Sequence, residues 1–145
     1  MLEQLSRAAF EADMSRLDAA AAKRLGWTVV QVEYPMFDVI FNHRRLAPLR
    51  LRLNCVGWDE LPPSIELLNA DGSHVAAAPP NVGGVFHPGH HPNTGRFFVC
   101  MRGAREYHIH QSHVNDHWSN YRGQPGNDLI GIVGQLWRAW NKAAP

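Results

Sequence analysis

Four strand-like segments lie close together in the first half of the chain, and this spacing limits what the chain can fold into. The segments are residues 27–34, 36–41, 49–55 and 64–68. The first is rich in β-branched and aromatic side chains, and the third alternates apolar with basic side chains. The connections are too short to hold crossover helices, with residues 43–48 expected as a turn, so consecutive strands run antiparallel. A four-stranded antiparallel meander is predicted.

Helical patterns stand on either side of these segments. Residues 1–24 carry apolar side chains at spacings of three and four together with an alanine run, and they predict one N-terminal helix. Asn127 or Asp128 is expected to cap a C-terminal helix. The buried face of this helix is expected to hold Leu129, Val133, Leu136 and Trp140. Gly131 and Gly134 each lower helix stability by about 1 kcal/mol relative to Ala, so packing has to hold the helix in place.

Length and composition fit a single α+β domain over residues 1–145. A chain of 145 residues, 45% of them hydrophobic, is long enough to bury a core of its own. Lys and Arg total 14 against 13 Asp and Glu, so the basic stripe of a nucleic-acid binder is not expected. No apolar run approaches the roughly 18 residues of a membrane span. The first residues lack the apolar run of a signal peptide and only two cysteines are present, which predicts a cytoplasmic protein.

The segment between the predicted strands and the last helix holds the chemistry-bearing residues. Residues 71–95 are rich in Pro and Gly, which favours an irregular extended loop. A short apolar segment, residues 96–101, follows and contains Cys100. Residues 102–127 are polar and rich in histidine.

This order of motifs resembles the ubiquitin-conjugating (E2) family, whose UBC-like fold places a four-stranded antiparallel meander between an N-terminal helix and an active-site loop. In that family a Pro-Pro pair follows the third strand, a His-Pro-Asn tripeptide precedes the nucleophilic cysteine, and a Trp-Ser pair follows it. The corresponding residues here are Pro62-Pro63, His91-Pro92-Asn93, Cys100 and Trp118-Ser119. The resemblance covers nearly the whole chain and implies a UBC-like fold with no cofactor.

The resemblance implies that Cys100 accepts a ubiquitin-like protein as a thioester from an E1-like activating enzyme. The acyl group would then pass to an amine of a protein acceptor. Asn93 can donate hydrogen bonds to the oxyanion or tie the loop down, while His91 and Pro92 shape the loop. Members of this kind belong to bacterial gene clusters linked to defence against phage. Neither a nucleic acid nor a membrane is expected as a partner.

A cysteine that carries an acyl group attacks as the thiolate, which needs partial exposure and an electropositive setting. Arg96, Arg102 and the neighbouring histidines are candidates for that setting. The alternative is that Cys100 is a small buried hydrophobic residue at the end of an apolar strand. Cys55 stands in the alternating strand without any such context and is expected to be structural.

Two further roles follow from the resemblance. In the family the N-terminal helix forms part of the E1-docking surface, so Arg7 and Arg16 are candidates for that contact. The acidic residue that helps activate the incoming lysine lies beyond the helix in the family, and residues 141–145 contain none. Asp116 or a loop histidine, such as His108 or His110, is the candidate substitute.

The histidine-rich segment also supports a competing interpretation. Glu106, His108 and His110 alternate, so on a strand they would project from one face. With Cys100 they form Cys-x5-Glu-x-His-x-His, a donor set that suits Zn²⁺. The pattern resembles a predicted metal-binding family that accompanies bacterial ubiquitin-like gene clusters. Because a thiolate held on zinc is a poor acyl carrier, three hypotheses stay open: a conjugating enzyme, a zinc-binding accessory module, and an inactive E2-like scaffold. The alternative for the histidines is a polar surface loop without a chemical role.

Overall fold

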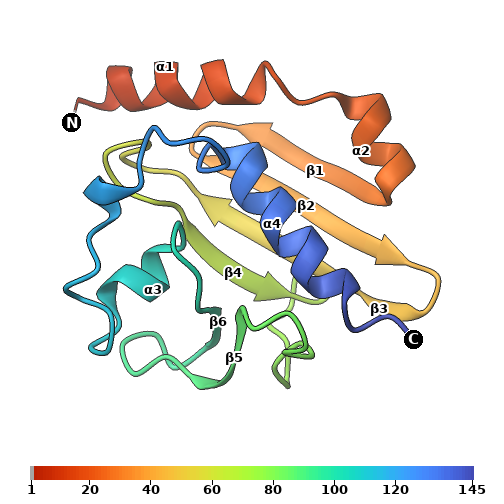
Figure 1. The fold of residues 1–145 in the computed structure, drawn as a ribbon. Coiled ribbons are helices and arrows are strands. Elements are labelled where there is room, and N and C mark those ends of the chain that lie inside the picture. The colour runs from red at the N-terminus through yellow and green to blue at the C-terminus, as the bar shows by residue number, and fades with distance from the viewer. Residues whose placement is uncertain (1) are drawn as a thin grey trace.

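A computed structural model describes residues 2–145, and Figure 1 shows helices at one edge of a sheet and a long helix across its face. The helices are α1 (Glu3–Met14), α2 (Ala19–Leu25), α3 (Arg105–Ile109) and α4 (Leu129–Asn141), with a 3-10 turn at Trp118–Asn120. The strands are β1 (Trp27–Glu33), β2 (Met36–His43), β3 (Leu46–Asn54), β4 (Ser64–Leu68), β5 (Phe86–His90) and β6 (Phe97–Val99). Within the described residues, no helix is long and apolar enough to cross a lipid bilayer.

The predicted meander is confirmed. Strands β1 to β4 form one sheet in sequential order, and each neighbouring pair is antiparallel. Phe37 on β2 pairs with Leu53 on β3, which pairs in turn with Ile65 on β4, and all three side chains are buried. The second and third strands are longer than predicted, because the turn between them is confined to residues 44–45 and His43 still pairs with Leu46.

The N-terminal segment differs from the single helix predicted over residues 1–24. Helix α1 ends at Ser15, and a second helix, α2, begins after Asp18. Asp18 has an extended backbone, and its carboxylate accepts a hydrogen bond of 3.0 Å from the backbone N–H of Ala21. A side chain that caps a free amide in this way favours a new helix start over helix continuation.

Helix α4 covers one face of the sheet through aromatic contacts (Figure 1). Phe41 of β2 lies 5.2 Å from the ring of Trp137 and 5.6 Å from the ring of Trp140. The four residues expected on the buried face of this helix are all buried. The cap is Asp128, whose carboxylate accepts from the backbone N–H of Gly131 at 2.8 Å.

A second, two-stranded sheet lies within the part of the chain expected to be irregular. Strand β5 occupies residues 86–90 and pairs antiparallel with β6, in a hairpin that carries the His-Pro-Asn tripeptide in its connection. Phe86 and Val99 are partners in this pair and are both fully buried. Tertiary packing of these two side chains therefore overrides the weak strand propensity of the sequence Phe-His-Pro-Gly-His.

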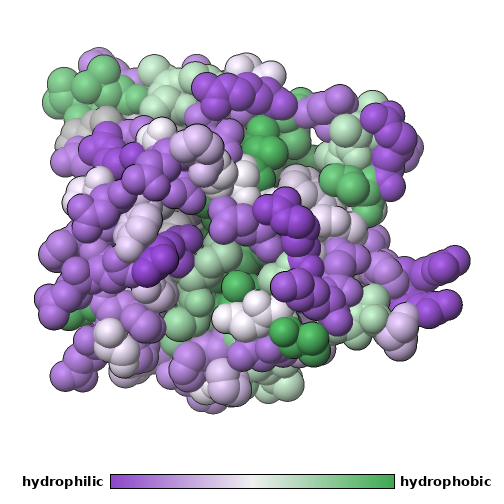
Figure 2. All heavy atoms as spheres, viewed as in Figure 1, coloured by the Kyte–Doolittle hydropathy of each residue, from purple (hydrophilic) through white to green (hydrophobic). Residues whose placement is uncertain are grey.

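The face shown in Figure 2 is mostly hydrophilic, and hydrophobic side chains are exposed near the start of α1. Leu2 and Leu5 are 68% and 56% exposed there.

Candidate active site around Cys100

Cys100 follows directly after β6, and its thiol is free and half-buried. Its backbone N–H donates to the carbonyl oxygen of Val85 at 2.7 Å, so the β5–β6 hairpin holds the residue in place. The Sγ atom lies 3.7 Å from Nε2 of His113. Cys55, by contrast, is fully buried in the main core, and burial raises the pKa of its thiol.

His91 is fully buried and connects the hairpin to α3. Its Nδ1 accepts from the backbone N–H of Asn93 at 3.0 Å. Nδ1 therefore carries a lone pair, and in the neutral ring Nε2 carries the proton. Nε2 lies 2.9 Å from the carbonyl oxygen of Glu106 and donates to it. His91 thus links the turn at Asn93 to the backbone of α3.

Pro92 and Asn93 are exposed in the turn that follows His91. The side chain of Asn93 makes no hydrogen bond to any residue of the described chain, so its amide does not tie the loop down. The backbone closes the turn instead, with His91 N–H donating to the Arg96 carbonyl and Gly95 N–H to the His91 carbonyl, both at 2.8 Å.

Glu106 belongs to α3, and its buried side chain anchors this helix to β4. Its Oε2 accepts from the Ser64 hydroxyl at 2.6 Å, and its Oε1 accepts from the Ile65 N–H at 2.8 Å. The strand on which Glu106, His108 and His110 would project from one face does not form, because residues 105–109 are helical. Residues two positions apart on a helix point to different sides, so the alternation does not gather these side chains on one face.

His108 and His110 are also committed to backbone partners. Nε2 of His108 accepts from the Gly103 N–H at 3.1 Å, and its Nδ1 lies 2.7 Å from the carbonyl oxygen of Asp116. Nδ1 of His110 accepts from the Ser112 N–H at 3.1 Å, and the ring stacks on Phe98. Burial lowers the pKa of both imidazoles. Among residues 2–145, no group of three or more His, Cys, Asp or Glu side chains is arranged to hold a metal ion. The structure therefore does not gather Cys100, Glu106, His108 and His110 into a zinc site.

Asp116 is the centre of a dense polar cluster. Its Oδ2 accepts from Arg102 Nε at 2.8 Å and from the Tyr107 hydroxyl at 2.5 Å, while its Oδ1 accepts from the Tyr121 hydroxyl. Arg102 first, and then the two hydroxyl groups, hold the pKa of this carboxyl well below its usual range. Both oxygens are already paired in this state of the protein.

Trp118 anchors the end of the histidine-rich segment to the β3–β4 connection. Its indole N–H donates to the carbonyl oxygen of Asp59 at 2.8 Å, and its ring lies 5.9 Å from that of Trp58. Arg122 pairs with the Asp59 carboxylate at 2.6 Å in the same place. The segment is thus tethered close to the β3–β4 connection.

His113 lies beside Cys100 and is not among the site residues that the sequence predicts. Its ring stacks on Tyr107, with the centroids 4.2 Å apart and the planes at 16°. Its backbone N–H donates to the His110 carbonyl at 2.8 Å, within a tight turn that points the ring back toward the sulfur. Nothing in the local sequence distinguishes it from the other histidines. Only the path of residues 110–117 brings it to Cys100.

Of the candidates for an electropositive setting around Cys100, the structure places a histidine, His113, at the sulfur. Burial raises the pKa of the Cys100 thiol above its ordinary value. Arg102 is engaged by Asp116, and Arg96 is exposed. The resting thiol is therefore protonated at neutral pH and needs a base to become a nucleophile.

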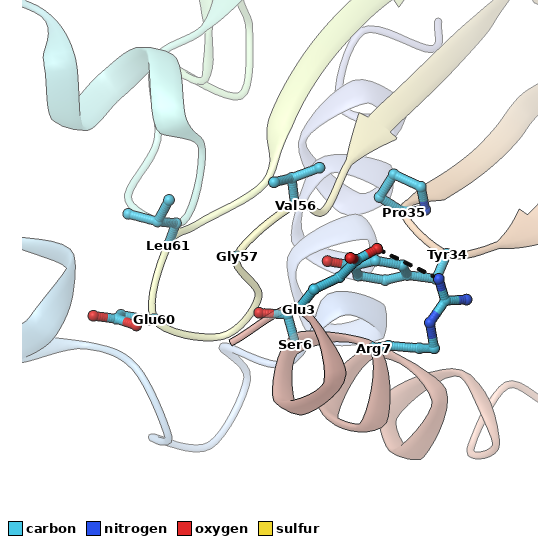
Figure 3. A pocket seen from close by; sticks show the side chains of 9 residues that line it. All are labelled: Glu3, Ser6, Arg7, Tyr34, Pro35, Val56, Gly57, Glu60 and Leu61. Atoms are coloured by element: carbon cyan, nitrogen blue, oxygen red, sulfur yellow. Dashed lines mark ion pairs between the residues drawn. The ribbon is translucent and has the colours of Figure 1, made fainter. Parts of the chain in front are cut away.

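A pocket of about 510 Å³ lies elsewhere, between α1, the β1–β2 turn and the β3–β4 connection. Figure 3 shows the side chains that line it: Glu3, Ser6, Arg7, Tyr34, Pro35, Val56, Gly57, Glu60 and Leu61. Arg7 pairs with Glu3 at 3.6 Å and lies over the ring of Tyr34, 4.9 Å from its centroid. The hydroxyl of Ser6 is buried without a hydrogen-bond partner among the described residues. Cys100 does not line this pocket.

Neither the models of known protein families nor the curated protein sequences include a match to this chain.

Proposed function

We propose that this protein is an E2-like enzyme of a bacterial, anti-phage conjugation pathway that carries a ubiquitin-like protein as a thioester on Cys100. The observation that carries the proposal is the position of Cys100 relative to the hairpin and the sheet. Its accessible thiol directly follows a hairpin whose turn holds His91-Pro92-Asn93. This hairpin follows a four-stranded antiparallel meander and precedes a helix that packs on the sheet. The order of elements supports a UBC-like fold.

In the proposed reaction, Cys100 first takes the acyl group from the E1-like enzyme. Its sulfur attacks the thioester carbonyl, a new C–S bond forms, and the thiol of the E1-like enzyme leaves. An acceptor amine then attacks the new thioester, and the sulfur of Cys100 leaves as an amide forms. The free side chain of Asn93 supports a role in stabilising the oxyanion over a role in bracing the loop.

The surface around α1 is the candidate docking site for the E1-like partner. Arg7 lines the pocket beside α1, and its side chain is 49% exposed. Arg16 lies beyond α1 with a side chain that is 62% exposed. The exposed Leu2 and Leu5 add apolar surface at the start of α1. This combination of apolar and cationic groups supports a protein partner at this end of the molecule.

One observation favours an inactive E2-like scaffold as the second candidate. The raised pKa of the Cys100 thiol would slow a cysteine that had no base to assist it. A scaffold of this kind would bind the ubiquitin-like protein without forming a covalent bond. The zinc-binding module has less support, because the side-chain oxygens of Glu106 and the ring nitrogens of His108 already form hydrogen bonds within the protein.

A loading assay tests the proposal. With its E1-like partner, ATP and the ubiquitin-like protein, the chain should gain a mass adduct that free thiol removes, because a thioester exchanges with thiols and an amide does not. Cys100→Ala should abolish the adduct, and Cys100→Ser should trap a more stable ester. Cys55→Ala is the matched control and should still load. Normal loading of Cys100→Ala would rule out Cys100 as the acyl carrier, and stable binding without any adduct would favour the scaffold.

A further inference from the structure

We infer that His113 is the acid–base partner of Cys100, with Tyr107 and Asp116 as positioning residues that hold its imidazole at the sulfur. The inference rests on the proposed function, since it assigns a role in acyl transfer at the same cysteine. It concerns a residue that neither the motif order nor the His-Pro-Asn resemblance identifies.

The geometry at the sulfur carries the first step. Nε2 of His113 lies 3.7 Å from Sγ of Cys100, a distance at which a thiol can donate to a ring nitrogen. With the ring proton on Nδ1, the lone pair of Nε2 faces the thiol. The two nitrogens of His91 and those of His108 already face backbone groups. Among the described residues, His113 is the histidine whose ring nitrogen is found within hydrogen-bonding distance of the sulfur.

The surroundings hold this ring in place. Tyr107 stacks flat against it, and the Tyr107 hydroxyl donates to Oδ2 of Asp116. Asp116 is itself fixed by Arg102 and Tyr121. A catalytic group must keep its productive geometry to be effective, and a stacked ring whose neighbour is tied to a carboxylate meets that need.

Several titratable groups face the imidazole. Cys100 lies on one side, Tyr107 stacks on the ring, and the His110 ring lies 6.0 Å away. His108 is close enough that a charge on His113 contributes to lowering the pKa of the His108 imidazole. All four of these groups are uncharged at neutral pH, and Cys100 is the one to be deprotonated.

The proton balance is simple in both halves of the reaction. During loading, the thiol proton passes to Nε2 as the sulfur bonds to the carbonyl carbon, and the departing thiolate of the E1-like enzyme takes a proton back. During discharge, Nε2 accepts a proton from the attacking amine and returns it to the departing sulfur of Cys100. No oxidant, metal or further reactant is needed.

The test measures thiol reactivity and uses no conjugation partner. The full chain is treated with iodoacetamide in the presence of a chelator across pH 6 to 9, and mass spectrometry follows the Cys100 peptide. His113→Gln should lower the alkylation rate at pH 7 by roughly 10²-fold, the lower end of the range for a positioned acid–base group. The wild-type profile should show an inflection that the variant lacks, while the variant should rise steadily as bulk hydroxide deprotonates the thiol.

Two matched variants and an internal control accompany the test. His117→Gln removes an exposed histidine from the same segment and should alkylate as the wild type does. Tyr107→Phe keeps the stacked ring but removes the bond to Asp116, and it should lower the rate by a smaller factor. Cys55, which is fully buried, reports any opening of the fold.

The outcomes separate this inference from the proposed function. Equal rates and equal profiles for wild type and His113→Gln overturn the inference, as does an equal loss in His117→Gln. If Cys55 becomes reactive in His113→Gln, the variant has lost its fold and the wild-type pH profile is the test instead. A wild-type rate that rises steadily with pH, without an inflection, overturns the inference. A wild-type protein that shows the inflection but never loads contradicts the proposed function and leaves the Cys100–His113 pair in place.

Discussion

At the scale of single residues, Asp116 illustrates how a predicted reactive group serves as an anchor in the folded protein. From the sequence, Asp116 is a candidate substitute for the acidic residue that activates the acceptor. In the structure its two carboxylate oxygens are shared among Arg102, Tyr107 and Tyr121. A carboxylate held by three donors joins residues 102–121 into one unit, and this unit includes the stacked ring of His113.

Asp116→Asn should make the protein less stable at pH 7, and the loss should shrink in acid. The pKa of Asp116 lies below its unfolded value of about 3.9, so its contribution is fully present above that value and is lost as the pH falls below it. Urea unfolding of wild type and variant at pH 7 and at pH 3 measures the difference. A difference that does not depend on pH would contradict an ionic role for this carboxylate.

At the scale of secondary-structure elements, the start of α4 explains a glycine that looks unfavourable in the sequence. A Cβ atom on Gly131 would lie 2.5 Å from Oδ1 of Asp128 and 2.5 Å from the carbonyl oxygen of Gly126. The absence of a side chain therefore lets Asp128 cap the helix by accepting from the Gly131 N–H. Gly134 has no such constraint, since a Cβ atom there would meet only Arg138 Nη1 at 3.5 Å.

The two glycines should consequently respond in opposite ways to alanine. Gly134→Ala should raise the free energy of unfolding by up to about 1 kcal/mol through helix propensity. Gly131→Ala gains the same propensity but loses the cap, worth about 0.5–2 kcal/mol, and must also relieve two close contacts, so it should lower stability by about 1 kcal/mol. Urea denaturation of both variants measures these changes, and a stabilised Gly131→Ala would contradict the role assigned to the cap.

At the scale of the whole molecule, Asp13 connects three segments that are far apart in the sequence. Its Oδ2 accepts from the indole N–H of Trp58 at 3.1 Å and from the backbone N–H of Leu129 at 3.0 Å. Asp13 is 9% exposed, and burial raises the pKa of its carboxyl. Helix α1, the β3–β4 connection and α4 therefore meet at one acceptor beside the hydrophobic core.

Asp13→Ala should destabilise the protein by about 3 kcal/mol, because two buried donors lose their partner. Asp13→Asn is the matched control, since its amide oxygen still accepts a hydrogen bond, and its loss should be much smaller. Chemical denaturation followed by tryptophan fluorescence compares the two. Equal losses in both variants would show that the negative charge, and not the shared acceptor, holds these segments together.

The sheet β1–β4 and the buried face of α4 were determined by the sequence alone. Alternation along a strand and spacing along a helix are local patterns, and short connections leave consecutive strands no arrangement but antiparallel. Cys100 and His91 could also be selected from motif order, and the structure places His91 in the hairpin that holds Cys100.

Only the tertiary structure decided the second hairpin, helix α3 and the neighbour of Cys100. Strand β5 exists because Phe86 and Val99 are buried together, and α3 is held by the bonds of Glu106 to β4. The local pattern Glu-x-His-x-His is compatible with a strand or a helix. The hydrogen bonds of the Glu106 carboxylate to β4 are what fix the helix. His113 reaches Cys100 because the Asp116 cluster and Trp118 fix the path of the intervening segment. Such contacts depend on partners distant in the sequence, and local periodicity carries no information about them.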